Sequence, residues 1–272
     1  MHSEKRGREF YILAIFFALF VLFLYGPLSA ILILAFQGPN GGLTFPLNGV
    51  SLHWFANLFE QQAVGDFGGS FRRSFMLGVM VMIVTVLVSL LAGLAFRRKF
   101  VGATPLFYLS VASLVVPSII ISLGIGVLFQ QLGLEPAWYS SAFGAQLTWT
   151  LPFGVLIMFA VFNRFSPSYE EAARDLGANS WQTFSNVVLP MIAPSLIGVG
   201  LFGFTLSYDE FARTLMTSGT YNTLPLEIYG MTTNVTTPVL YALGAVTTFF
   251  SLIVIGATLG IIAAMNRRRS KG

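Results

Sequence analysis

Cysteine is absent from this 272-residue sequence, and only two histidines occur, His2 and His53. The lack of cysteine excludes disulfide bonds, thiolate metal sites and cysteine nucleophiles. We expect no metal site, because neither histidine has the neighbouring ligands that zinc requires, and we predict no catalytic residue. The phosphate-binding pattern Gly-x-x-x-x-Gly-Lys-Ser/Thr is also missing, so the chain does not bind ATP by that route.

Charged residues are scarce as well. They make up 10% of the chain, against about a quarter in a typical soluble protein, whereas 55% of the residues are hydrophobic. Six charge-free intervals are each long enough for the roughly 20 apolar residues with which a helix crosses a bilayer. We therefore predict an all-α polytopic membrane protein that forms a single transmembrane domain over 1–272. The six predicted spans lie at about 10–36, 75–96, 105–130, 143–163, 191–217 and 239–265.

Helices are favoured over a barrel, because the apolar runs are continuous and do not alternate. The first run is about twice as long as the apolar part of a signal peptide, so we predict a span that is retained. Most of the 15 basic residues lie before the first span, in the loops after the second and fourth spans, and in the tail. Positive charge stays in the cytoplasm, which predicts cytoplasmic termini. The net charge of +4 thus indicates membrane orientation and not nucleic-acid binding.

The loop 164–190, between the fourth and fifth predicted spans, has the pattern of two short helices joined by a turn. A serine followed three residues later by glutamate has the spacing of a capping box. A glycine supplies the left-handed conformation that ends a helix, and asparagine or serine can cap the next one. In chain order these predicted signals are Ser168 with Glu171, then Gly177, then Asn179 or Ser180, with the second helix ending before Pro190.

The same loop resembles the signature of ABC-importer permeases. That signature is Glu-Ala-Ala, three residues, Gly, nine residues, Ile, one residue, Leu-Pro. Val187 replaces the usual isoleucine, which is a mild change. The remaining positions are matched by Glu171, Ala172, Ala173, Gly177, Leu189 and Pro190. The six-span pattern and the position of the loop agree, so the resemblance covers nearly the whole chain and implies the type I permease fold.

The resemblance implies that the loop is a coupling helix, which docks into a cytoplasmic ATPase and receives force from it. A bacterial inner-membrane importer is implied, with a second, similar but distinct permease, two ATPase subunits and an extracytoplasmic solute-binding protein. ATP and magnesium would be bound by the ATPase, so this chain itself is not an enzyme and carries no cofactor. The residues predicted to couple to the ATPase are Glu170, Glu171, Ala172, Ala173, Arg174, Asp175, Gly177, Leu189 and Pro190.

Ionisable residues cluster near the outer end of the fifth predicted span. Such groups are costly inside a membrane and usually face a cavity or a partner. Ser207, Tyr208, Asp209, Glu210 and Arg213 are therefore predicted to line the substrate path. The alternative is a structural role, because Arg213 lies four residues after Asp209 and three after Glu210, a spacing that pairs charges on a helix. Both alternatives remain open.

The solute is suggested only by a further resemblance. Ser-x-Asp-Glu/Asp, then Gly, then Leu-Pro-x-x-Ile-Tyr is similar to the spermidine/putrescine branch of these permeases, and here the pattern runs from Ser207 to Tyr229. This similarity implies a polyamine or a related amine. Arg213 stands where an apolar residue is expected, so an anionic or amino-acid-like solute remains an alternative. A secondary transporter is a further alternative, although no inverted repeat is evident.

Overall fold

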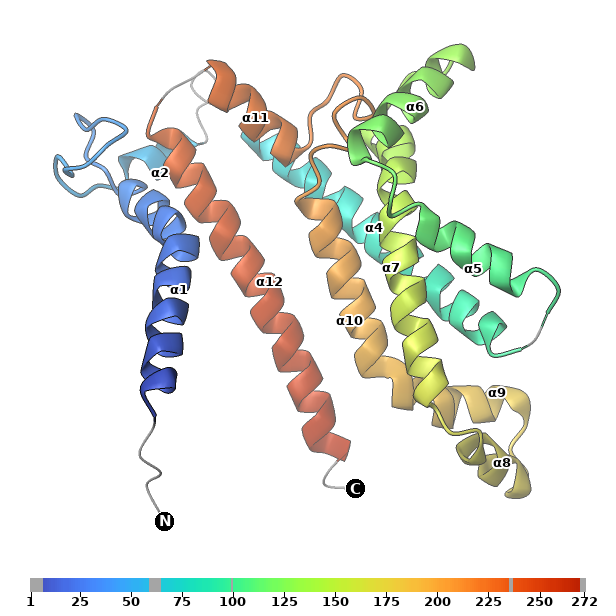
Figure 1. The fold of residues 1–272 in the computed structure, drawn as a ribbon. Coiled ribbons are helices and arrows are strands. Elements are labelled where there is room, and N and C mark those ends of the chain that lie inside the picture. Colours follow the sequence, from blue (N-terminus) through green and yellow to red (C-terminus); the bar gives the residue numbers. More distant parts are fainter. Residues whose placement is uncertain (1–6, 59–64, 99, 235–236, 270–272) are drawn as a thin grey trace. The chain divides into compact units, whose positions relative to one another are not determined.

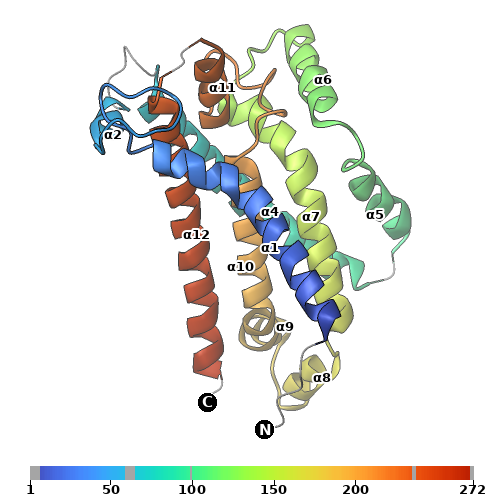
Figure 2. The same ribbon diagram turned by 60° about the vertical axis from the view of Figure 1, so that its left-hand side comes forward.

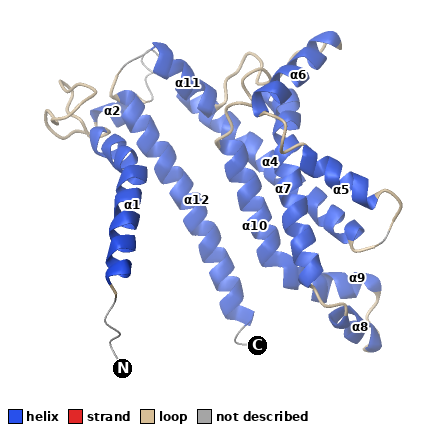
Figure 3. Ribbon diagram, viewed as in Figure 1, coloured by secondary structure: helices blue, strands red, loops and turns tan. Residues whose placement is uncertain are grey.

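The computed structural model describes residues 7–58, 65–98, 100–234 and 237–269, and within these ranges the chain is helical with no strand (Figures 1 and 3). Two of the elements, η1 and η2, are wider π-helical turns. In order, the elements are α1 (Arg8–Leu34), α2 (His53–Asn57), α4 (Phe67–Phe96), α5 (Ala103–Ala112), α6 (Ser118–Gln131), η1 (Trp138–Ala142), α7 (Phe143–Arg164), α8 (Ser168–Asp175), α9 (Ser180–Thr183), η2 (Phe184–Val188), α10 (Leu189–Tyr208), α11 (Leu224–Asn234) and α12 (Val239–Arg269).

Five helices among the described residues are long and apolar enough to cross a membrane. They expose large apolar side chains, as α1 does with Phe23, which is 80% exposed. Such surfaces suit lipid, because water gives apolar groups no favourable surroundings. The five helices are Arg8–Leu34, Phe67–Phe96, Trp138–Arg164, Ser180–Tyr208 and Val239–Met265.

The continuous third span predicted at 105–130 is wrong. This stretch forms two shorter helices, α5 and α6, which are separated by a break from Ser113 to Pro117. Proline lacks a backbone N–H and disfavours the helical conformation of the residue before it. In addition, the Ser113 hydroxyl lies 2.7 Å from the carbonyl of Ser110 and 2.7 Å from that of Thr148 on α7, so its single hydrogen is shared between them and the end of α5 is held against its neighbour.

The fifth predicted span, 191–217, is wrong at its C-terminal end, and the predicted end of the preceding short helix before Pro190 is wrong as well. The helical stretch begins at Ser180 and runs through α9, η2 and α10 without a break before Pro190. Pro190 is the second residue of α10 and directly follows the wider π-helical turn η2, so the helical stretch continues through this proline. The helix ends at Tyr208, so the residues from 209 to 223 form a non-helical segment.

Contacts divide the chain into two compact units. The first comprises Met1–Gly65 and Gly230–Phe250, and the second comprises Asp66–Tyr229 and Ser251–Gly272. In the first unit Gln37 is fully buried: its Oε1 accepts from the backbone N–H of Asn48 at 2.7 Å, and its Nε2 donates to the carbonyl of Gly42 at 3.1 Å. Tyr241 of α12 donates to the carbonyl of Leu43 at 2.7 Å, which ties this loop to the helix.

The core of the second unit is formed by α4, α7 and α10, which lie side by side (Figure 2). Small residues allow the close approach: a Cβ added to Gly154 of α7 would lie 2.1 Å from the Ser89 hydroxyl of α4. A buried hydrogen bond of 3.0 Å from Thr85 to Thr150 also links α4 to α7. The apolar cluster near the ends of α7 and α10 comprises Met158, Phe162, Val188, Ile192, Leu196 and Val199.

Candidate functional site

The first candidate site is the elbow, defined as residues 165–179, which joins α7 to α9 through α8. The predicted capping box of Ser168 and Glu171 is wrong. Pro167 is the N-cap residue, and its carbonyl accepts from the N–H groups of Glu170 and Glu171 at 2.9 and 3.1 Å. Ser168 is therefore already inside the helix, where its hydroxyl cannot cap the first turn, and it lies 2.6 Å from the hydroxyl of Ser166.

The end of α8 is sharply defined, and here the predicted glycine stop is confirmed. Gly177 has a φ of +87°, a left-handed conformation that glycine adopts without penalty. Its N–H donates to the carbonyl of Arg174 at 2.8 Å, and the N–H of Ala178 donates to the carbonyl of Ala173 at 3.0 Å. This pair of bonds is a Schellman motif, which satisfies the last carbonyls of the helix and reverses the chain direction.

The next helix begins with a true capping box, and of the two predicted caps Asn179 is the one that forms. The Asn179 side chain accepts from the N–H of Gln182 at 2.9 Å, and the Gln182 side chain accepts from the N–H of Asn179 at 2.9 Å. Two backbone donors are thereby satisfied at the start of α9. The elbow therefore has fixed geometry at both of its turns.

An ion pair joins the elbow to α4. Arg97, which follows the last residue of α4, donates to both carboxylate oxygens of Glu170 at 2.7 and 3.1 Å. The side chains are 22% and 18% exposed, so the pair is mostly shielded from water. The guanidinium also lies 5.2 and 5.3 Å from the ring centres of Phe162 and Phe165. Two-pronged pairs of this kind hold both groups in a defined orientation.

The elbow presents charged and apolar side chains together. Glu171, Arg174 and Asp175 are exposed. Sequence reasoning missed the apolar part, formed by Tyr169 and Leu176 of the elbow together with the adjoining Trp181 of α9, which are 51%, 90% and 72% exposed. The sequence contained a signal for this apolar part, namely large apolar side chains within an otherwise polar loop. Such residues at a protein surface often mark a docking site.

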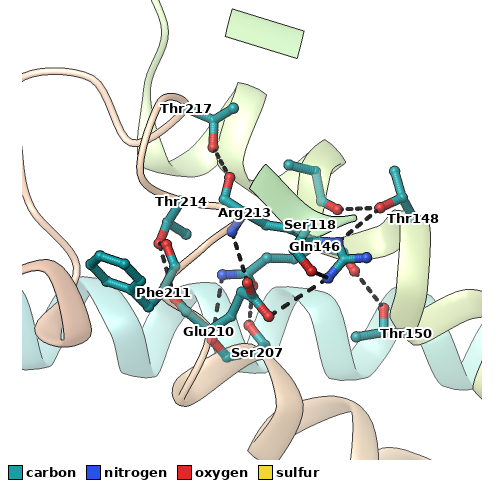
Figure 4. A network of polar contacts seen from close by, with 11 residues as sticks. Ser118, Gln146, Thr148, Thr150, Ser207, Glu210, Phe211, Arg213, Thr214 and Thr217 are labelled. Carbon is teal, nitrogen blue, oxygen red and sulfur yellow. Dashed lines mark hydrogen bonds and ion pairs between the residues drawn. The ribbon is translucent and has the colours of Figure 1, made fainter. Parts of the chain in front are cut away.

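The second candidate site is a buried polar network between α7 and the segment after α10 (Figure 4). The fully buried Gln146 of α7 accepts a short hydrogen bond from the hydroxyl of Ser207, and its Nε2 donates to the Ser207 carbonyl at 3.3 Å. Thr150 donates to the Gln146 carbonyl at 3.2 Å. These bonds fix the last turn of α10 against α7 in the interior, where unsatisfied polar groups would be costly.

Arg213 is the centre of this network and is only 2% exposed. Its backbone N–H donates to Glu210 Oε1 at 2.7 Å, and its Nη1 lies 3.8 Å from Glu210 Oε2. The same guanidinium donates to the hydroxyls of Thr148 at 3.2 Å and Ser118 at 2.6 Å. It also lies 4.6 Å from the ring centre of Trp149. The buried cation is therefore compensated by one carboxylate, two hydroxyls and one aromatic face.

The segment after Arg213 is held by backbone contacts. The N–H of Met216 donates to the Ser122 hydroxyl of α6 at 2.9 Å, and the Ser141 hydroxyl of η1 donates to the Thr217 carbonyl at 2.6 Å. Gly219, with a φ of +70°, pairs with Ala137, and a Cβ at this position would lie 2.0 Å from a backbone oxygen. The non-helical segment is thus packed on α6, η1 and α7.

The family model for the inner membrane component of binding-protein-dependent transport systems matches residues 85–271, which include the elbow and the network. The chain belongs to this family. It is the permease component of an ABC importer and a multi-pass protein of the inner membrane. As a permease it is a transport subunit.

Known relatives of the permease differ in their solutes. It is 25% identical over 237 residues to the spermidine/putrescine transport system permease protein PotC of Escherichia coli, covering 87% of this chain and 88% of PotC. It is 26% identical over 215 residues to the putrescine transport system permease protein PotI of the same organism, covering 76% and 75% of the two chains. A shorter match, 32% over 142 residues, is to the sulfate transport system permease protein CysT, covering 48% and 51%.

Solved structures share the fold of the permease. A bacterial ABC transporter involved in the import of the acidic polysaccharide alginate matches with a TM-score of 0.65 and 18% identity, over 97% of this chain and 99% of that chain. The MetNI methionine ABC transporter matches with a TM-score of 0.56 and 15% identity, over 73% of this chain and 94% of that chain.

The predicted coupling residues fall into two groups in the permease. Glu171, Ala172, Arg174, Asp175 and Gly177 are exposed on the elbow. Pro190, the second residue of α10, is exposed as well. The other three contact the chain itself: Glu170 binds Arg97, Ala173 is half-buried, and Leu189 packs against the apolar cluster.

The predicted path residues are brought together, but most of them face inward. Ser207, Tyr208, Glu210 and Arg213 are buried in the chain, and only Asp209 is exposed. The helical pairing considered from the sequence does not form, because α10 ends before these residues. Glu210 and Arg213 pair within a turn, which favours the structural alternative for them. Among the described residues, no group of three potential ligands could hold a metal ion.

Proposed function

We propose that this permease forms the translocation path of an ATP-driven importer for a small polar solute, and that the elbow is the surface on which the ATPase docks. The observation that carries the proposal is the exposure of Leu176, at 90%, on a segment whose geometry is otherwise fixed. A free apolar side chain on a rigid turn is well suited to enter a cleft of a partner.

The elbow is also attached in a way that would transmit force. The ion pair from Glu170 to Arg97 links α8 to α4, and the capping box of Asn179 links the elbow to the continuous stretch of α9, η2 and α10. A push on α8 would therefore reach two membrane-spanning helices without first bending a loose loop. Coupling of this kind requires elements that move as rigid bodies.

The proposed assembly contains a second, distinct permease, two ATPase subunits that bind ATP and magnesium, and an extracytoplasmic solute-binding protein. Both termini of this chain and its elbow would face the cytoplasm. The solute would pass between the two permeases, so this chain alone would not transport. The family description supports the binding-protein partner, because it names a binding-protein-dependent transport system.

For the solute we propose a polyamine or a related amine. Asp209 supports this proposal: it is exposed, and the neighbouring negative charge of Glu210 is offset by Arg213. A carboxylate that no cation among the described residues pairs with would, beside the path, attract a cationic solute. The names of PotC and PotI agree with this proposal, whereas that of CysT, a sulfate permease, favours the anionic alternative.

Copurification tests the docking surface. The chain is coexpressed with its cognate subunits and carries Leu176→Asp, with Leu132→Asp as a matched control, because Leu132 is also exposed, at 62%, but lies after α6. We expect Leu176→Asp to lose most of the bound ATPase and Leu132→Asp to retain it. Equal recovery of the ATPase with both variants would exclude Leu176 from the contact.

Uptake kinetics test the solute. Asp209→Asn in the assembled importer is expected to raise the KM for putrescine severalfold, because the variant removes an attractive charge without changing the size of the side chain. Sulfate and an amino acid serve as alternative substrates. Putrescine uptake with an unchanged KM would exclude Asp209 from the path, and uptake of sulfate alone would replace the polyamine proposal with the anionic one.

A further inference from the structure

A pocket of about 590 Å³ lies where the end of α4 meets α8 and η2. Its polar lining includes Arg97, Arg98, Glu170, Arg174 and Thr183. The proposed coupling of the ATPase through the elbow uses neither this pocket nor Arg98 nor Thr183.

The charges that line the pocket are unbalanced. The only carboxylate in the lining, Glu170, is already bound through both oxygens to Arg97. Arg98 and Arg174 are exposed, and the described residues provide neither with an ion-pair partner. The pocket therefore carries a surplus of positive charge, which favours an anionic occupant.

Thr183 supplies a second, independent indication. The residue is only 3% exposed and belongs to the lining of the pocket, and among the described residues its hydroxyl has no hydrogen-bond partner. Buried hydroxyls are normally paired. A rotation of the side chain toward the pocket would let an acceptor oxygen there satisfy this donor.

Part of the lining is apolar and continuous with the core. Leu94, Phe184 and Val188 line the pocket and also belong to the apolar cluster between α7 and α10 or pack against it. A charged rim over an apolar floor, at the end of a membrane-spanning helix, matches the chemistry of a phospholipid at the bilayer surface.

We propose that this pocket binds a phosphate-bearing anion, with the guanidinium groups of Arg98 and Arg174 and the hydroxyl of Thr183 as its donors. Guanidinium groups recognise phosphate oxygens through paired hydrogen bonds. The phosphate belongs either to the headgroup of an anionic lipid or to a free anion. In both cases the ligand bridges α4 and α8 beside the ion pair of Arg97 and Glu170, and stiffens the connection between the elbow and the spans.

Lipid binding to the purified full-length chain tests the proposal, and it needs neither transport nor the ATPase. A negative result therefore leaves the proposed function untouched. The probes are phosphatidylglycerol and phosphatidylcholine with identical acyl chains, titrated in mixed micelles, with bound lipid counted by native mass spectrometry. We expect phosphatidylglycerol to bind at least tenfold more tightly than phosphatidylcholine.

Variants locate the binding to the pocket. Arg98→Gln is expected to weaken phosphatidylglycerol binding about tenfold, the usual value for a hydrogen bond to a charged group, and Thr183→Val about fivefold. Arg98→Lys should retain part of the affinity. The matched control is Arg72→Gln, which removes the same charge near the opposite end of α4. Melting temperatures of all variants establish that they are folded.

A second arm distinguishes the two sources of phosphate. Inorganic phosphate at millimolar concentration competes with the lipid, and sodium chloride of equal ionic strength is the control. Displacement by phosphate but not by chloride assigns the site to a free anion, and resistance to both assigns it to the lipid. The proposal would be overturned if the two lipids bound equally and inorganic phosphate displaced neither of them. It would also be overturned if the Arg98→Gln variant bound phosphatidylglycerol as tightly as the unmodified chain.

Discussion

The ion pair between Arg97 and Glu170 gives the most quantitative prediction. Exposed pairs contribute about 0.2–1 kcal/mol, whereas removing one partner of a fully buried pair costs about 3–5 kcal/mol. This pair lies between these limits, since its side chains are 22% and 18% exposed and two hydrogen bonds, of 2.7 and 3.1 Å, join them. We therefore expect a coupling energy of about 1–2 kcal/mol between the two residues.

The two single variants should not be equal. Arg97 also lies over the rings of Phe162 and Phe165, and each such contact contributes about 0.5–1 kcal/mol. Arg97→Gln should therefore destabilise the chain by about 2–3 kcal/mol, and Glu170→Gln by about 1–2 kcal/mol. The double variant should cost less than the sum of the two, because the pair is lost only once.

The assay is a double-mutant cycle on the purified chain in detergent, with denaturant unfolding followed by helical circular dichroism. The pair of Arg73 and Asp66, in which the Asp66 side chain is 50% exposed, provides a second cycle as a control and should give a smaller coupling energy. A coupling energy for Arg97 and Glu170 no larger than that of the control would refute the argument that this pair joins the elbow to α4.

Three further predictions follow from the contacts. Gly177→Ala should lower the free energy of unfolding by about 1 kcal/mol, because alanine is strained at a φ of +87° even though the space around the residue is open. An unchanged free energy of unfolding would contradict the argument from the left-handed conformation. Arg213→Met should lower the melting temperature more than Glu210→Met, because it removes donors to two hydroxyls as well as the ion pair, and the reverse order would be evidence against the network. Hydrogen bonds, first from the N–H of Gly69 and then from Arg73, lower the pKa of Asp66 below its ordinary 3.8. The ionised Asp66 cap therefore stabilises α4 above about pH 4, and this contribution to stability is lost as the pH falls further. Asp66→Ala should flatten the acidic part of the pH–stability profile, and an unaltered profile would show that the cap contributes nothing.

The sequence predicted the membrane-embedded helical architecture because long apolar intervals without charge leave few other structures. The sequence also predicted that α8 ends at Gly177, because glycine is one of the few residues that readily adopt the left-handed conformation of a helix end. The start of α8 was wrong because two signals competed: Pro167 fixes the helix start one residue earlier than the serine pattern suggests. Local patterns could not decide between them without the backbone geometry.

The C-terminal end of the fifth predicted span shows a different limit. The charge-free interval ends at Asp209, directly after the last residue of α10, but the predicted span was extended past these charges to residue 217. The end depends on contacts from distant parts of the chain, such as those of Gln146 with Ser207 and of Ser122 with Met216. The same applies to the third span, where Ser113 contacts α7. No pattern within a single segment contains these contacts.

The central claim is that the elbow receives force from the ATPase, and ATP-driven uptake into proteoliposomes that contain the complete importer tests it most directly. The informative variant reverses two exposed charges on α8, Glu171→Lys with Asp175→Lys, and its control is Arg72→Gln on the far end of α4. We predict that the double reversal abolishes ATP-dependent uptake while the chain stays folded and the control transports normally. Full ATP-dependent uptake by the reversed elbow, or uptake by this chain alone on a proton gradient, would contradict the claim.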